Sequence, residues 1–375
     1  MDNFIERSIT LHPQINTPAL IVDAERMHEN IRAMQQLADE NQKNLRPHIK
    51  THKSVLIAQQ QLETGATGVT VAKLGEAEVM AEAGIIDIFI ANQITHPRKL
   101  RKLRQLHDAV RLSVGLDHMQ QVYLYAAYFS NPDRPLEIMI EIDSGLQRCG
   151  VKPGVDLLNL AQNIQGQPGL HLKGIFTHAG QVYTARSTEE IYAIAELEGN
   201  IMQEAYLLLQ KNRFKVESVS VGSTPTTPVV VKNPAVTEIR PGNYVFHDGI
   251  QVSLGCCKIE KCALYVLATV ISQPESNRII IDAGSKALHL DQGAHSVKLL
   301  TGFGTLLNIE GTLDRLSEEH GIIHLAHPLE IQLGSPVIIL PNHACAVTNL
   351  YDYYYLLESD GTFQLLNIDA RGRSQ

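Results

Sequence analysis

Basic and imidazole side chains are concentrated between residues 46 and 53, in the run Arg-Pro-His-Ile-Lys-Thr-His-Lys. Residues 45–49 read as a short strand, and the side chains of a strand alternate between its two faces. Arg46, His48 and Lys50 therefore share an ionisable face, while the opposite face is apolar. An edge strand at the surface would show the same alternation, so the surrounding elements must decide whether this face carries chemistry.

Further polar groups follow later strands, at the points where those strands end. They are Asp143 to Gly150 after the strand predicted at 136–142, Thr177 to Gly180 after 172–177, Gly222, Ser223 and Thr224 after 216–221, and Gly242, Asn243 and Tyr244 after 236–240. The last two groups combine close backbone approach with hydroxyl and amide donors, as phosphate-binding loops do. Gly-Ser-Thr is also a common turn composition, so this group alone is weak evidence.

A lysine at one strand end and phosphate-binding loops at others suggest pyridoxal phosphate. Its aldehyde forms a Schiff base with a lysine, predicted here to be Lys50, and its phosphate anchors the far end. His178 would then stack on the pyridine ring, and Arg148 would donate to the ring oxygen or nitrogen. The alternatives for these two residues are a core histidine and a salt-bridged surface arginine.

Strands and helices alternate regularly from Leu45 onward. The predicted strands are 45–49, 68–72, 85–90, 109–114, 136–142, 172–177, 216–221 and 236–240. Eight strands alternating with helices fit a parallel (β/α)8 TIM barrel better than a doubly wound open sheet, and no Gly-x-Gly-x-x-Gly follows an early strand. In such a barrel the active site lies at the carboxyl ends of the strands, where the polar groups above are found.

Past residue 250 the helical pattern ends and short β-rich runs take over. They are 263–271, 278–281, 321–325 and 336–340. We therefore expect a (β/α)8 barrel over residues 26–255 and a C-terminal β-rich domain over 256–375. The N-terminal segment, residues 1–25, contains a predicted strand at 18–22 that can join the β-rich domain.

The amino-acid composition excludes several classes of protein. Hydrophobic residues make up 44% and charged residues 19%, as in ordinary soluble proteins, and the net charge of -8 argues against nucleic acid as a partner. No run approaches the roughly 20 apolar residues needed to span a membrane, and the first residues lack a signal-peptide pattern, which favours a cytoplasmic protein. The five cysteines have no framework spacing and are expected to be reduced thiols.

Several local motifs point to one family. They are residues 46–53, Gly68-Val-Thr-Val-Ala-Lys-Leu-Gly-Glu-Ala77, Asp282-Ala-Gly-Ser-Lys-Ala287, Ser317-Glu-Glu-His-Gly321 and Pro341-Asn-His-Ala-Cys345. Over nearly its whole length the sequence resembles the fold-type III pyridoxal phosphate enzymes related to alanine racemase, and within them the D-serine dehydratase and D-threonine aldolase group. The resemblance implies that Lys50 binds the cofactor, that residues 222–224 and 242–244 hold its phosphate, and that the β-rich domain completes the site, usually in a homodimer.

The resemblance also implies a divalent metal, commonly zinc (Zn²⁺), with His343 and Cys345 at the ligand positions. Imidazole and thiolate are good zinc ligands, and two protein ligands leave positions open for a substrate hydroxyl. On spacing alone a His-x-Cys pair is weak evidence, because on a strand it only places both side chains on one face. The implied substrate is a D-amino acid with a β-hydroxyl: Lys50 would remove the Cα proton while the metal activates the hydroxyl, so that D-serine gives pyruvate and ammonia.

Other functions stay open. The nearest is D-threonine aldolase-like cleavage to glycine and an aldehyde. A racemase is less favoured because it needs no metal, although a second acid/base could come from one of four C-terminal tyrosines, Tyr351, Tyr353, Tyr354 and Tyr355. A non-catalytic pyridoxal phosphate-binding protein would resemble the barrel alone, and a degenerate barrel used as a scaffold would bind no cofactor. Residues 91–96 match no motif, and we expect them to shape the substrate pocket.

Overall fold

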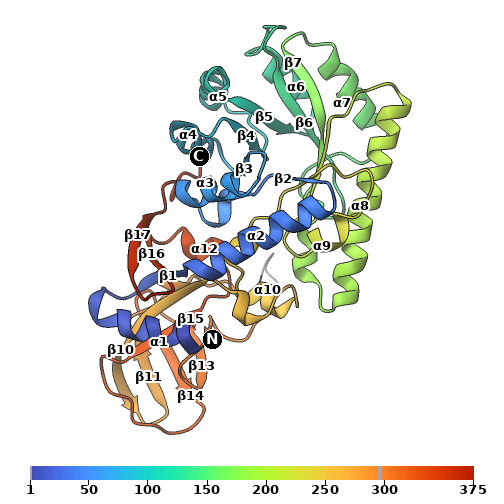
Figure 1. The fold of residues 1–375 in the computed structure, drawn as a ribbon. Coiled ribbons are helices and arrows are strands. Elements are labelled where there is room, and N and C mark those ends of the chain that lie inside the picture. Colours follow the sequence, from blue (N-terminus) through green and yellow to red (C-terminus); the bar gives the residue numbers. More distant parts are fainter. Residues whose placement is uncertain (1, 294–297) are drawn as a thin grey trace. The chain divides into compact units, whose positions relative to one another are not determined.

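The computed structural model describes residues 2–293 and 298–375. Contacts between residues divide the chain into two compact units (Figure 1). The barrel unit comprises residues 33–50, 55–242 and 372–375. The β unit comprises the chain up to Arg32, residues 51–54 and residues 243–371. The division at Asn243 comes earlier than the boundary at residue 256 expected from the end of the helical pattern.

The barrel unit, all of whose residues are described, contains an eight-stranded sheet whose neighbouring strands are parallel. The strand order is β2-β9-β8-β7-β6-β5-β4-β3. The two ends of this order also meet, because His48 pairs with Thr70 and the Thr70 N–H donates to the Pro47 carbonyl at 2.8 Å. The sheet is therefore closed, which confirms the predicted (β/α)8 barrel and excludes the open sheet. Its strands are β2 (Asn44–Leu45), β3 (Val69–Val71), β4 (Asp87–Ile90), β5 (Arg111–Leu116), β6 (Leu136–Glu141), β7 (Leu170–Phe176), β8 (Ser218–Val221) and β9 (Glu238–Ile239).

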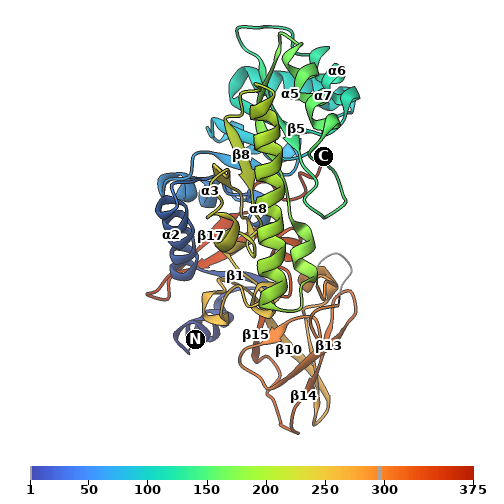
Figure 2. The ribbon, with the colours of Figure 1, turned by 90° about the vertical axis from the view of Figure 1, so that its right-hand side faces the viewer.

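Helices follow the strands and bury one apolar face each. In α7, for example, the buried residues recur at helical spacing: Leu157, Leu160, Ala161 and Ile164. The 24-residue helix α8 begins where the Ser187 side chain accepts a hydrogen bond from the Glu190 N–H, and it packs along β8 (Figure 2). The helices of the barrel unit are α3 (Val55–Glu63), α4 (Leu74–Glu82), α5 (Pro97–Ala109), α6 (Met119–Ala126), α7 (Val155–Gln165), α8 (Thr188–Lys211) and the single turn α9 (Thr227–Val230). Helix α2 (Ala24–Glu40) is divided between the two units after Arg32.

The first barrel strand is shorter than predicted. Ladder pairing as a strand is confined to Asn44–Leu45, and Ile49–Thr51 form a 3₁₀ turn, η2. Backbone hydrogen bonds continue past Leu45, since the N–H groups of Arg46 and His48 donate to the Ile239 and Pro241 carbonyls at 3.0 Å each, and the extended stretch ends where η2 begins at Ile49. The prediction that strand alternation places Lys50 on one face with Arg46 and His48 was therefore wrong. Lys50 is positioned by the turn that follows the strand.

Aromatic side chains fill part of the barrel interior. Phe89 in β4, Met139 in β6 and Phe176 in β7 form a buried cluster, and the two rings meet edge to face with centroids 5.1 Å apart. Gly115 in β5 has no room for a side chain, because a Cβ there would lie 2.8 Å from the Phe176 ring. The interior is thus a packed core, as is usual in this fold, and chemistry is restricted to the loops at its rim.

The β unit is built on a mixed sheet of nine strands among the described residues. The main order is β13-β14-β11-β10-β1-β16-β17, and β15 pairs with β10 and β12. The N-terminal strand β1 lies in this sheet, antiparallel to β10 and parallel to β16. The strands are β1 (Ala19–Asp23), β10 (Leu264–Glu275), β11 (Arg278–Ile281), β12 (Thr305–Leu306), β13 (Gly311–Leu316), β14 (Gly321–Leu325), β15 (Pro336–Leu340), β16 (Tyr353–Leu357) and β17 (Phe363–Asn367).

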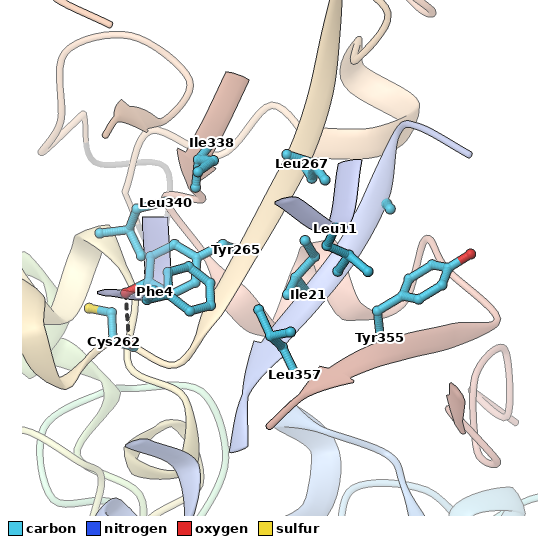
Figure 3. Packing of buried hydrophobic residues seen from close by; sticks show 11 residues of the cluster. Phe4, Leu11, Ile21, Cys262, Tyr265, Leu267, Ile338, Leu340, Tyr355 and Leu357 are labelled. Atoms are coloured by element: carbon cyan, nitrogen blue, oxygen red, sulfur yellow. Dashed lines mark hydrogen bonds between the residues drawn. The ribbon is translucent and has the colours of Figure 1, made fainter. Parts of the chain in front are cut away.

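The core of the β unit joins residues that are far apart in the sequence. Helix α1 (Asp2–Leu11) contributes Phe4, whose ring centroid lies 4.5 Å from that of Tyr265 in β10 (Figure 3). Ile21 of β1 and Leu357 of β16 belong to the same cluster. The described residues of the unit also form the short helices α10 (Gly249–Ser253), α11 (Ser285–Leu288) and α12 (Ala344–Thr348).

Two further observations bear on the sequence expectations. All five cysteines are free thiols in the structure, as expected. Within residues 2–293 and 298–375, no helix combines the length and apolar character needed to cross a membrane.

Candidate active site

Lys50 lies in the turn η2, directly after the first barrel strand. Its backbone N–H points to the Nδ1 atom of His48, at 3.4 Å, and His48 is buried where it pairs with Thr70 of β3. The lysine is therefore found at the carboxyl end of the first strand of a closed barrel. This is the edge at which barrel enzymes place their reactive groups.

The loop after β8 is compact and rich in buried hydroxyl groups. Gly222 has a φ of +112°, and a Cβ there would lie 3.0 Å from the Thr227 hydroxyl. Its N–H donates to the Glu198 carboxylate at 2.9 Å. Ser223 and Thr224 are both buried, at 4% and 5% exposure. The loop thus has the close backbone packing and the hydroxyl donors that were predicted for a phosphate site.

The predicted second phosphate segment spans the division between the two units. Gly242 ends its stretch of the barrel unit, and Asn243 and Tyr244 begin a stretch of the β unit. All three residues are buried. The Asn243 amide donates to the carboxylate of Asp248 at 2.6 Å.

Arg148 and His178 follow the fifth and sixth barrel strands, as the sequence predicted. The Arg148 guanidinium is half exposed and lies 3.6 Å from the carboxylate of Glu141, the last residue of β6. His178 is partly buried and directly follows Thr177, whose carbonyl accepts a hydrogen bond from Arg240. Arg148 therefore forms the salt bridge considered as its alternative role, and its partner is the buried Glu141 at the same end of the barrel.

Arg240 is a buried cation to which the sequence analysis gave no role. Its Nε donates to the Ser220 hydroxyl at 2.7 Å, and its guanidinium carbon lies 5.3 Å from the Phe176 ring centroid and 5.6 Å from that of Phe89. Burial lowers the pKa of Arg240 to about 10. Its position directly after the last barrel strand was the sequence signal that could have identified it.

The stretch 91–96, which matched no motif, connects β4 to α5. Gln93 donates to the Glu141 carboxylate at 2.5 Å, and the Ile94 N–H donates to the Tyr125 hydroxyl at 3.0 Å. Burial raises the pKa of Glu141. The stretch therefore fixes a buried carboxyl group at the end of β6, close to Arg148.

Glu141 also belongs to a cluster with Asp117 and Cys149, whose potential ligand atoms lie within 4.8 Å of one another. The oxygens of this cluster already accept hydrogen bonds from the chain. Asp117 accepts from the Gly150 N–H at 2.9 Å and from the Gln121 amide at 3.1 Å. We therefore interpret this cluster as the support of the loop after β6.

His343 and Cys345, the predicted metal ligands, lie in the β unit at the start of α12. They are thus not on a strand, and their proximity does not follow from strand alternation. The Nδ1 atom of His343 is 2.7 Å from Asp291 Oδ2, and a further hydrogen bond joins the side chains of His343 and Cys345. Burial disfavours the protonated imidazole, but Asp291 and the thiol outweigh it and hold the pKa of His343 well above its ordinary value.

Two polar side chains contact the Cys345 sulfur. The Thr51 hydroxyl is 3.3 Å from Sγ, and the Asn243 amide is 3.9 Å from it. Thr51 is the residue after Lys50 in the sequence. The sulfur is therefore contacted by two polar groups of the β unit.

This donor set fits a divalent metal such as zinc. Because Asp291 is hydrogen-bonded to Nδ1 of His343, Nε2 is the ring nitrogen that can bind a metal, and the Cys345 sulfur is a second possible ligand atom. Asp248 holds the peptide between His343 and Cys345, since its Oδ2 accepts from the Ala344 N–H at 2.9 Å. Sequence analysis missed both Asp248 and Asp291, because neither lies in a motif with the ligands.

Comparison with protein families gives two matches. Residues 22–248 match the alanine racemase N-terminal domain, and residues 263–357 match the putative serine dehydratase domain.

Individual relatives match over almost their full length. The chain is 36% identical to D-threo-3-hydroxyaspartate dehydratase of Delftia sp., covering 93% of this chain and 96% of the relative. It is 30% identical to D-threonine aldolase of Arthrobacter sp. (96% and 94% covered) and 30% identical to D-serine dehydratase of Dictyostelium discoideum (94% and 95% covered).

Solved structures agree with these matches. D-threonine aldolase from Filomicrobium marinum has a TM-score of 0.89 at 27% identity, with 96% of this chain and 97% of that chain covered. D-threo-3-hydroxyaspartate dehydratase has a TM-score of 0.88 at 35% identity, in a cysteine-to-alanine variant in the metal-free form (94% and 97% covered) and a histidine-to-alanine variant (94% and 95% covered). The two substituted positions in that enzyme are two residues apart.

Proposed function

Since the chain belongs to the family that joins an alanine racemase N-terminal domain to a putative serine dehydratase domain, we propose that it removes water from D-3-hydroxy amino acids. The family resemblance and the lyase class expected from the sequence are confirmed by these matches. The specific reaction and the roles of individual residues are proposals, argued below from the side chains.

The cofactor assigned to the barrel unit is pyridoxal phosphate. Lys50 supplies the amine that binds the cofactor aldehyde, and the loop 222–224 with residues 242–244 supplies donors for the phosphate. His178 would pack on the cofactor ring and Arg148 would donate to it, while His48, whose Nδ1 lies 3.4 Å from the Lys50 backbone nitrogen, would support the turn that carries Lys50. The buried hydroxyls and the tight backbone at Gly222 support this assignment, because they suit a bound dianion better than a solvent-exposed turn.

The metal assigned to the β unit is a divalent ion, most simply zinc, held by His343 and Cys345. When bound, the cofactor withdraws electrons from Cα and the metal polarises the substrate's β-hydroxyl. The Lys50 amine takes the Cα proton, and the β-hydroxyl leaves as water. The enamine that remains then hydrolyses to a keto acid and ammonia, so one water is lost and one is consumed.

The His343–Cys345 pair is the observation that carries the dehydratase proposal. In this chain the two ligand types are two residues apart and joined by a hydrogen bond. The 3-hydroxyaspartate dehydratase has been studied with a histidine and a cysteine replaced at the same spacing, one of the two variants being in a metal-free form. A metal at this pair would aid departure of a poor leaving group, which dehydration requires.

Retro-aldol cleavage is the second candidate. It is supported by the D-threonine aldolase relative and by the high structural similarity to an enzyme of the same name. In that reaction the proton is taken from the β-hydroxyl instead of from Cα, and the Cα–Cβ bond breaks. The two reactions therefore leave different products from the same substrates.

Product analysis separates the two reactions. The full chain, loaded with pyridoxal phosphate and Zn²⁺, is incubated with D-serine, D-threo-3-hydroxyaspartate and D-threonine, with the L-isomers as controls. Keto acid and ammonia in equal amounts are expected from at least one D-substrate, and from no L-isomer. Glycine and an aldehyde would establish the aldolase, and a lack of turnover of every D-substrate would contradict both candidates.

We also propose, from the family resemblance, that the enzyme acts as a homodimer. Light scattering of the holoenzyme should then give twice the 41.5 kDa chain mass. A mass of one chain at micromolar concentration would contradict this.

A further inference from the structure

Asp291 is bound to two consecutive residues of the segment that carries the proposed metal ligands. Its backbone carbonyl accepts from the Asn342 side-chain amide at 2.9 Å, and its carboxylate Oδ2 meets His343 Nδ1 at 2.7 Å. Asn342 is 3% exposed, and its amide also donates to the Gly302 carbonyl at 3.0 Å. The backbone of Asp291 is therefore bound to Asn342, and its side chain is bound to His343.

A second imidazole lies against the same carboxylate. His289 Nδ1 is 3.2 Å from Asp291 Oδ1, so the two carboxylate oxygens face two different histidines. Oδ2 is thereby directed to His343. Because the adjoining peptide N–H of Ala344 is bound by Asp248, the backbone of the ligand segment has its own support. The Asp291 carboxylate thus contacts the imidazole of His343, whereas the peptide after His343 is held by Asp248.

The chemistry of imidazole makes this contact decisive for metal binding. A neutral imidazole carries one N–H, and a nitrogen can bind a metal only when it does not carry the proton. A carboxylate at Nδ1 accepts only, so it holds the proton on Nδ1 and leaves the lone pair on Nε2. The same contact fixes the ring rotation and increases the basicity of the ligating nitrogen.

On these grounds we propose that Asp291 is a positioning residue for metal binding, which holds His343 in the tautomer and orientation that present Nε2 to the metal. The inference rests on the proposed function, because it takes His343 and Cys345 to be the ligands. It adds a residue outside the His-x-Cys motif, 52 positions away from His343 in the sequence.

The test compares two aspartate–histidine pairs of the β unit. Asp291→Asn keeps the shape of the side chain, but its amide can donate to Nδ1 and so favours the wrong tautomer. Asp314→Asn is the matched control, since Asp314 Oδ2 lies 2.9 Å from His324 Nδ1 on the exposed surface of β13 and β14. Both variants are prepared as full-length, pyridoxal phosphate-loaded protein, stripped of metal and titrated with Zn²⁺ against a chromophoric chelator.

We expect Asp291→Asn to bind Zn²⁺ about 10- to 100-fold more weakly than the native enzyme, the usual loss for a partner of a metal ligand. Asp314→Asn should bind like the native enzyme, and the cofactor absorbance of both should be unchanged. Equal Zn²⁺ affinity of Asp291→Asn and native enzyme, or equal weakening in both variants, would overturn the inference. If the native enzyme itself bound no Zn²⁺, the proposed function would fail instead.

A second measurement needs no variant at Asp291 and covers the case in which that variant does not fold. In native, Zn²⁺-loaded enzyme with ¹⁵N-labelled histidine, the ring nitrogens of His343 are assigned by comparison with His343→Gln. The proposal predicts a protonated Nδ1 and a metal-bound Nε2. A protonated Nε2 would overturn it.

Discussion

Lys50 and Lys53 are only three residues apart, but their surroundings in the structure differ. Lys50 ends a stretch of the barrel unit in the turn η2. Lys53 belongs to the β unit, has a φ of +53°, and its carbonyl accepts from the Ala370 N–H at 2.9 Å. The Lys53 backbone is thus hydrogen-bonded to a residue near the C-terminus within the β unit, whereas Lys50 lies at the end of a barrel strand. This difference favours Lys50 as the cofactor-binding residue.

Replacement of Lys50 tests this choice. Lys50→Ala should lose the visible absorption band of lysine-bound cofactor together with all turnover, because the variant lacks the amine that binds the aldehyde. Lys53→Ala is the control and should keep the band, as measured by absorbance after addition of pyridoxal phosphate and removal of the excess. A band that persists in Lys50→Ala and disappears in Lys53→Ala would move the assignment to Lys53.

The loop after β8 depends on a glycine for two separate reasons, its φ of +112° and the nearby Thr227 hydroxyl. Gly222→Ala should cost about 1–3 kcal/mol of stability from backbone strain, and in addition it should weaken pyridoxal phosphate binding about tenfold. Gly84→Ala isolates the backbone strain, since Gly84 has a φ of +85° and a Cβ added to it would have no neighbour within 4 Å. Urea denaturation and cofactor titration measure both effects. Equal cofactor affinity in the two variants would contradict a role of the loop in binding.

A buried ion network joins the first and last barrel strands. Arg46 donates to Glu238 at 2.7 Å and to Asp87 at 2.6 Å. Burial alone would raise the pKa of Glu238, but Arg46 outweighs it, so the folded-state pKa lies below the ordinary value. The folded state therefore binds fewer protons than the unfolded state. The stabilisation is complete above the unfolded pKa of about 4.3 and is lost as the pH falls through the folded pKa.

Glu238→Gln should accordingly lower the free energy of unfolding at pH 7 by about 3 kcal/mol, with a weaker decline on acidification than in the native protein. Glu217→Gln is the control, because Glu217 pairs with Lys215 at 2.8 Å on the surface and its loss should cost less than about 1 kcal/mol. Urea unfolding between pH 7 and pH 3 measures both. If the free energy of unfolding of Glu238→Gln declined on acidification as much as that of the native protein, Glu238 would be excluded as a source of that decline.

On the scale of the whole molecule, periodicity was enough to predict the architecture. Short extended runs separated by helical spacing allowed the eight barrel strands to be counted, although the first and last are only two residues long in the structure, Asn44–Leu45 and Glu238–Ile239. The turn at Lys50 could not be predicted, because the alternation of residue types continues to residue 50 although the backbone turns at Ile49. His343 and Cys345 could be identified because they belong to a sequence motif. Asp291 and Asp248 could not, because they are far from this motif in the sequence and meet it only in the folded chain.

The metal dependence of ammonia release from D-serine and D-threo-3-hydroxyaspartate tests whether the enzyme is a metal-dependent dehydratase. We expect equal amounts of keto acid and ammonia from the holoenzyme, loss of this activity after chelation, and recovery with Zn²⁺ in the native enzyme but not in His343→Ala. Undiminished release of ammonia and keto acid after complete removal of metal would contradict this expectation.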